Sequence, residues 1–167
     1  VNKNMACTEI SNNHWIVLKG HGKKSASGDK VDWITDDTIV SGNELYPQLN
    51  TGVVPVVAFA DICFGGAATA NLGQTDDGSL VGAFLKAGAI HFAGPADELI
   101  TDGDSFLQCC FEELQSTSFG ESFRRARQKF PHIGLSYPLY GCPTNTLQGI
   151  FATPSPKPLV YKLSPAG

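Results

Sequence analysis

The stretch VVAFADICFGG, residues 56–66, joins a continuous apolar run to a polar, glycine-rich end. Residues 56–60 are all apolar, as in strands of a parallel sheet that are buried on both faces. The strand is expected to begin after Pro55, because a proline inside a central strand would lack a hydrogen-bond donor. It ends in Asp61 and Cys63, and two glycines follow. A core strand needs neither a carboxylate nor a thiol at its end, so this end is a candidate functional site.

A second predicted strand also ends in residues that can do chemistry. Residues 14–19, HWIVLK, are mostly apolar and run directly into Gly-His-Gly at 20–22, which predicts a buried strand and a turn. In sheets of parallel strands, functional groups gather at the carboxyl ends of the strands. His21 and Cys63 are therefore expected to lie at the same edge of one sheet.

A cysteine and a histidine together can cleave an acyl bond. The thiolate attacks the acyl carbon, and the imidazole takes up the thiol proton and later gives it to the leaving amine. This predicts Cys63 as the nucleophile and His21 as the general acid and base. The backbone N–H groups of Gly22 and Cys63 are the predicted oxyanion hole. Either residue alone would read as a buried thiol or a turn histidine, but two glycine-flanked strand ends favour a site.

The remaining pattern alternates between strands and helices. This alternation predicts an α/β fold with a mostly parallel sheet and helices on both faces. Strands are predicted at 14–19, 56–60, 89–94, 137–141 and 158–163, and helices at 79–88, at 104–115 and from Ser118 to 130. A capping box at Ser41 and Glu44 predicts a short helix that Pro47 ends. Residues 23–38 are polar and predict a surface excursion.

The composition is that of one globular domain. The chain has 167 residues, of which 42% are hydrophobic, and this predicts a single domain over 1–167. Its net charge of −4 gives no electrostatic basis for binding nucleic acid or a membrane surface. Five cysteines without a C-x-x-C pair give no basis for a structural zinc site, so no metal is predicted.

The two strand ends together resemble the caspase-like cysteine peptidases, which include caspases, metacaspases, gingipain-like peptidases and CHAT domains. The resemblance rests on VLKGHG (17–22) and VVAFADICFGG (56–66), because in this group a strand-end His-Gly precedes a strand-end Asp-x-Cys-x-Gly. Three downstream segments resemble the helix, strand, two helices and final strand of CHAT and gingipain-like members: 78–95, 105–130 and 137–144.

The resemblance implies a three-layer caspase-like sandwich, a His21/Cys63 dyad and an endopeptidase that acts on a protein or peptide. It also implies a role for Asp61, since the residue two before the nucleophile often lines the pocket for the side chain preceding the cleaved bond. A carboxylate there would pair with a basic side chain, which predicts cleavage after Arg or Lys. The alternative is a structural Asp61 that accepts hydrogen bonds in the turn.

The chain departs from the family pattern in two places. Gly-Cys-Pro stands at 141–143, where the family usually has Gly-Asp-Pro. The family also has two strands ahead of the histidine strand, whereas only 13 residues precede that strand here. We therefore expect the first strands of the sheet to be missing from this chain and to come from an upstream domain or another chain. Residues 1–167 would then be the catalytic C-terminal portion of a longer protein.

Other motifs in the sequence permit other functions. The acids of DWITDD (32–37) and TDDG (75–78) could bind calcium, as in some relatives, although solvated loop acids are more common. His91 lies in an apolar run and is predicted to be a core histidine, and RRAR (124–127) an exposed helix face. Two alternatives to the peptidase stay open: a non-catalytic caspase-like scaffold that binds a protein partner, and a redox-sensing thiol. The compartment stays open as well, with the cytoplasm slightly favoured.

Overall fold

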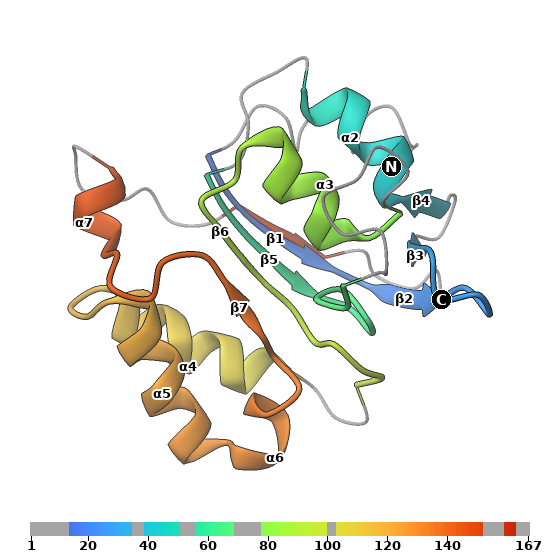
Figure 1. Cartoon of the computed structure of the whole chain (residues 1–167). Helices are drawn as coiled ribbons and strands as arrows, with labels where there is room; N and C mark the ends of the chain where they lie inside the picture. Colours follow the sequence, from blue (N-terminus) through green and yellow to red (C-terminus); the bar gives the residue numbers. More distant parts are fainter. Residues whose placement is uncertain are drawn as a thin grey trace.

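The computed structural model describes residues 14–34, 39–50, 56–68, 78–99 and 103–151, and the backbone of a strand at 159–162. Its centre is a five-stranded sheet in the order β7-β6-β5-β1-β8 (Figure 1). Four strands run parallel, and only β7 pairs antiparallel, with β6. Their bounds are β1 Trp15–Lys19, β5 Val57–Asp61, β6 His91–Ala93, β7 Leu139–Tyr140 and β8 Leu159–Lys162. The predicted mostly parallel α/β sheet is confirmed.

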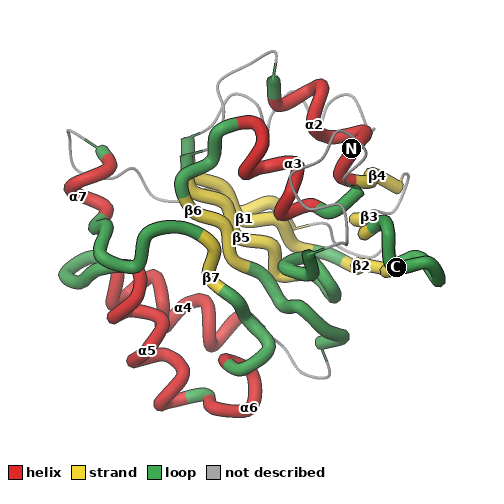
Figure 2. The backbone as a smooth tube through the Cα atoms, viewed as in Figure 1, coloured by secondary structure: helices red, strands yellow, loops and turns green. Residues whose placement is uncertain are grey.

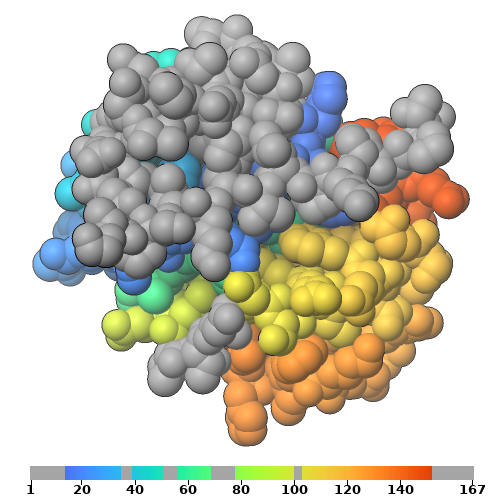
Figure 3. All heavy atoms as spheres, turned by 180° about the vertical axis from the view of Figure 1, so that it is seen from behind, coloured from blue at the N-terminus to red at the C-terminus, as the bar shows by residue number. Residues whose placement is uncertain are grey.

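Helices cover both faces of this sheet, which makes three layers (Figure 2). Alternate side chains of β1 enter different cores: Ile16 and Leu18 pack with α2 and α3, whereas Trp15 and Val17 pack with α4 and α5. Figure 3 shows the α4–α5 layer as one continuous surface behind the sheet. The helices are α2 Gly42–Leu49, α3 Leu80–Ala87, α4 Asp104–Leu114, α5 Phe119–Lys129, α6 Pro131–Gly134 and α7 Leu147–Ile150.

Aromatic packing fixes β5, the strand that leads to Cys63. Phe59 is fully buried, and its ring centroid lies 5.0 Å from that of Phe111 on α4 and 6.2 Å from that of Phe123 on α5. Burying one such side chain contributes about 2 kcal/mol to folding. The end of β5 is therefore held rigidly against the second helical layer.

Serine side chains cap two of the helices that cover the sheet. The Ser79 hydroxyl accepts from the Gly82 N–H at 3.0 Å at the start of α3, and Ser118 does the same with Glu121 at 3.3 Å at the start of α5. Gly88 ends α3 with a left-handed φ of 111°, a conformation that costs a residue with a side chain about 1 kcal/mol.

Two local predictions were wrong. Pro47 does not end α2, which continues to Leu49; a proline removes one hydrogen bond, and the buried Leu45 and Leu49 hold the helix against the core. Residues 23–38 are not simply a surface excursion, because the described part contains β2 His21–Lys24 and β3 Val31–Ile34, which pair with β4 Ile39–Ser41 in a second, antiparallel sheet. Alternation in VDWI was the missed signal, since Val31 and Trp33 are buried.

The chain's own C-terminal strand occupies the position beside β1. Strand β8 pairs with β1 in parallel, from Ile16 with Leu159 to Lys19 with Lys162. The edge strand predicted at 158–163 is therefore present. Among the described residues, no helix is long and apolar enough to cross a membrane.

His91, at the start of β6, is a core histidine. Its side chain is 1% exposed and stacks on Phe119 with ring centroids 3.9 Å apart and planes at 7°. The Asn145 side-chain nitrogen lies 3.2 Å from His91 Nε2, and the neutral tautomer that carries its proton on Nδ1 can accept a hydrogen bond there. Burial lowers the pKa of His91 to about 4, because the charged ring would lose its hydration.

We therefore expect His91 to make the fold acid-sensitive. Below pH 6.5 the unfolded chain takes up a proton at His91 that the folded chain refuses until about pH 4, so stability falls across that window. A pKa difference of this size corresponds to a loss of up to about 3 kcal/mol. Urea unfolding at pH 7 and pH 4.5 should show a smaller loss for His91→Gln than for the wild type. The exposed His132→Gln should keep the wild-type loss, and an equal loss in His91→Gln would contradict the account.

Candidate active site

The carboxyl ends of β1 and β5 lie side by side. The two strands are parallel, and their register pairs Lys19 with Asp61 as the last residues of each. The segments that follow meet directly, because the Gly22 backbone packs on the Cys63 peptide group. A Cβ on Gly22 would lie 1.9 Å from the Cys63 carbonyl oxygen and 3.2 Å from its nitrogen. Only glycine permits this approach, so the structure brings together the two strand ends that the sequence singled out.

His21 and Cys63 are both accessible at this edge. His21 is exposed and is the first residue of β2, directly before the glycine that touches the Cys63 peptide. Cys63 is a free and partly exposed thiol, whereas Cys109 and Cys110 are buried. Burial raises the pKa of Cys110 to about 12, which keeps that thiol protonated. Of the described cysteines, only Cys63 and the exposed Cys142 are open to a reagent.

The turn after Cys63 is strained. Phe64 has a φ of 60°, and it is the only described residue other than glycine with a positive φ. A side chain in this conformation costs about 1–3 kcal/mol, and such strain is concentrated at functional sites. The following glycine pair makes the turn possible, because a Cβ on Gly65 would lie 2.8 Å from the Ala60 methyl and one on Gly66 would lie 2.0 Å from the Gly94 carbonyl oxygen. The turn that presents Cys63 is thus determined by tight backbone packing.

A third segment, the loop 94–99 after β6, completes the edge. Backbone hydrogen bonds join it to the turn, from Phe64 N–H to the Asp97 carbonyl at 3.1 Å and from Gly66 N–H to the Pro95 carbonyl at 2.8 Å. The Leu99 N–H donates to the Cys63 sulfur at 3.3 Å. No sequence motif marked this loop as part of the site, although Gly94 and Pro95 directly after a predicted strand indicate a turn at the same edge.

Asp61 is buried and has partners within the chain. Its side chain is 7% exposed, the Tyr137 hydroxyl donates to Oδ1, and the Lys19 ammonium lies 3.7 Å from Oδ2. Lys19 also pairs with Asp104 at the start of α4. A basic substrate side chain would have to compete with Lys19 for this carboxylate. The role of Asp61 as a selector for Arg or Lys stays a prediction.

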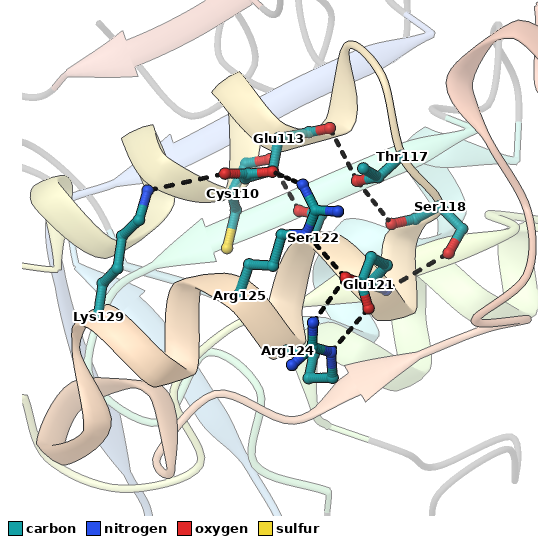
Figure 4. Close-up of polar contacts among 9 residues, drawn as sticks. All are labelled: Cys110, Glu113, Thr117, Ser118, Glu121, Ser122, Arg124, Arg125 and Lys129. Carbon is teal, nitrogen blue, oxygen red and sulfur yellow. Dashed lines mark hydrogen bonds and ion pairs between the residues drawn. The ribbon is translucent and has the colours of Figure 1, made fainter.

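The charged cluster on α4 and α5 is a paired surface and not a site (Figure 4). Arg124 and Arg125 both donate to Glu121 at 2.7 Å, and these hydrogen bonds lower the pKa of Glu121 to about 2. Arg125 also donates to Glu113 across the helix pair, and Lys129 lies 3.7 Å from the same carboxylate. Arg124 and Arg125 thus pair with neighbouring acids, as expected of an exposed helix face. Arg127 differs, because it is half-buried and donates to the backbone carbonyls of Gly134 and Tyr137.

Among the described residues, no group of three or more His, Cys, Asp or Glu side chains could hold a metal ion. Of the acids in the two calcium candidates, 32–37 and 75–78, Asp32 lies on β3, and the other four lie outside the described residues.

No protein-family model matches this chain, and no curated protein is significantly similar to it. The fold and the edge described above are those of an α/β protein that presents a partly exposed thiol beside a histidine-bearing strand.

We expect Gly22→Ala to disturb the site through its size alone. The added methyl would overlap the Cys63 carbonyl, so one of the two segments must move, which costs about 1–3 kcal/mol. Thermal unfolding should show a lower midpoint, and the alkylation rate of Cys63 should change. The neighbouring exposed Lys23→Ala is the control and should change neither. A wild-type midpoint in Gly22→Ala would mean that the segments do not touch.

Proposed function

We propose that this protein is a cysteine endopeptidase of the caspase-like type, with Cys63 as nucleophile and His21 as general acid and base. The observation that carries the proposal is the contact of Gly22 with the Cys63 peptide, which joins the two strand ends at the carboxyl edge of the sheet. The strained Phe64 turn and the accessible thiol support it further. The substrate would be a protein or a peptide.

The proposed reaction has two steps. His21 takes the proton of the Cys63 thiol, and the thiolate attacks the carbonyl carbon of the scissile bond. The N–H groups of Gly22 and Cys63 would stabilise the oxyanion, and the His21 imidazolium would give its proton to the leaving amine. Water then attacks the thioester with His21 as base and releases the acid product and the free thiol. No metal or cofactor is needed for this chemistry.

Asp61 is proposed to set a preference for Arg or Lys before the cleaved bond. Its burial makes an ion pair with a substrate side chain stronger than it would be in water. Lys19 already holds this carboxylate, so a basic substrate would bind by displacing the Lys19 ammonium. Asp104 would retain Lys19 when that happens, because it is the second partner of the same ammonium.

Hydrolysis of short fluorogenic peptides tests the peptidase. We expect cleavage by the wild type, a loss of at least about a thousandfold in Cys63→Ala, and a large loss in His21→Ala, since both act in one unit. The exposed Cys142→Ala is the matched thiol control and should keep full activity. A folded wild type that cleaves no peptide would favour the non-catalytic scaffold, and activity that survives Cys63→Ala would overturn the dyad.

A panel of peptides ending in Arg, Lys, Asp, Leu or Ala tests the specificity. If Lys19 competes for Asp61, Lys19→Met should raise kcat/KM for the Arg and Lys peptides by roughly tenfold, the size of one charge-assisted hydrogen bond. Asp61→Asn should abolish the basic preference. The exposed Lys23→Met controls for a general loss of positive charge. If Lys19→Met leaves kcat/KM for the Arg and Lys peptides unchanged relative to the Leu and Ala peptides, and Asp61→Asn keeps the basic preference, Asp61 does not select the substrate.

A further inference from the structure

We infer that the backbone N–H of Leu99 is a built-in donor that stabilises the thiolate of Cys63. The inference depends on the proposed function only in taking Cys63 as the reactive group, and it adds the loop 94–99 to the site. The Leu99 nitrogen lies 3.3 Å from Cys63 Sγ, with its hydrogen directed at the sulfur. An amide donor favours the charged form of an acceptor, because the hydrogen bond to an anion is stronger than that to a neutral thiol.

The donor is held in place from two sides. On the side of the turn, Phe64 and Gly66 donate to the carbonyls of Asp97 and Pro95. On the other side, the Ala96 N–H donates to the Ser136 carbonyl at 2.6 Å, which ties the loop to the segment before β7. Because these bonds involve backbone groups of a short loop, the Leu99 N–H has little freedom to turn away from the sulfur.

Leu99 and the proposed base, His21, come from segments on opposite sides of β5. His21 belongs to the segment after β1, and Leu99 to the loop after β6, and these strands flank β5 in the sheet (Figure 1). In the proposed reaction the His21 imidazole exchanges the proton, whereas the backbone amide of Leu99 does not titrate and only shifts the balance from thiol to thiolate. The proposed site thus combines the ends of three strands, β1, β5 and β6, and the sequence motifs lie at the first two.

The first test removes the donor. Leu99→Pro deletes the N–H, whereas Leu99→Ala trims the side chain and keeps it, so the pair separates the backbone effect from packing. Alkylation of Cys63 by iodoacetamide is followed by mass spectrometry over pH 5–10. We expect the half-maximal rate in Leu99→Pro at a pH about one unit higher than in Leu99→Ala, which should match the wild type.

The size of the change in the alkylation rate of Cys63 can also be predicted. At pH 6.5 the Leu99→Pro rate should fall roughly three- to fourfold, since the lost thiolate population is only partly offset by the higher reactivity of the more basic thiolate. Equal midpoints in the two variants would overturn the inference. A structural disturbance without loss of the donor would change the rate at every pH alike and leave the midpoint in place.

A second test needs no change in the loop. In the wild type, the NMR shift of the Leu99 amide proton should move with pH at the same midpoint as the alkylation rate, and this movement should vanish in Cys63→Ala. A Leu99 amide that does not follow the thiol would overturn the inference even if Leu99→Pro fails to fold. Neither readout requires peptide cleavage, so an inactive peptidase with a titrating Leu99 amide would sink the proposed function alone.

Discussion

The parallel pairing of β1 with β5 is the constraint on which the site depends. Its register sets Lys19 opposite Asp61 at the last position of both strands, so the chain leaves the sheet at the same height in each. The segments that follow are then close enough for the Gly22 backbone to rest on the Cys63 peptide. A shift of one residue would turn Asp61 and Phe59 to the other face of the sheet and would separate these groups. Packing of Phe59 between α4 and α5 opposes such a shift.

The same register places a charged pair, Lys19 and Asp61, at the strand ends that lead to the thiol. Lys19 and Asp61 are neighbours across the strands, and the Lys19 ammonium lies 3.7 Å from the buried Asp61 carboxylate. Tyr137 and Asp104 extend this pair to the second helical layer. Asp61 therefore contributes to the fold whatever it does for a substrate. Under the proposed function, specificity is a competition between this internal pair and an external cation.

Much of this fold follows from local sequence patterns. The apolar run at 56–60, the serine caps and the Gly88 stop are each determined by neighbouring residues, and all are present. The hairpin of β2 and β3 was missed because its strands are short: β2 has no buried side chain and β3 has only two. The predicted end of α2 at Pro47 was wrong because packing of α2 against the core continues the helix past the proline. The bond from Leu99 to Cys63 joins residues 36 positions apart. No periodicity encodes such a contact, so the third part of the site came from the structure alone.

Active-site labelling with a peptidyl acyloxymethyl ketone ending in Arg tests the central claim most directly. This reagent reacts with a thiolate only after its peptide part has bound. The account predicts a single adduct that peptide mapping places on Cys63, with labelling abolished in His21→Ala and unchanged in Cys142→Ala. Labelling that is equal in His21→Ala, or that is shared with Cys142, would contradict a dyad formed by these two strand ends.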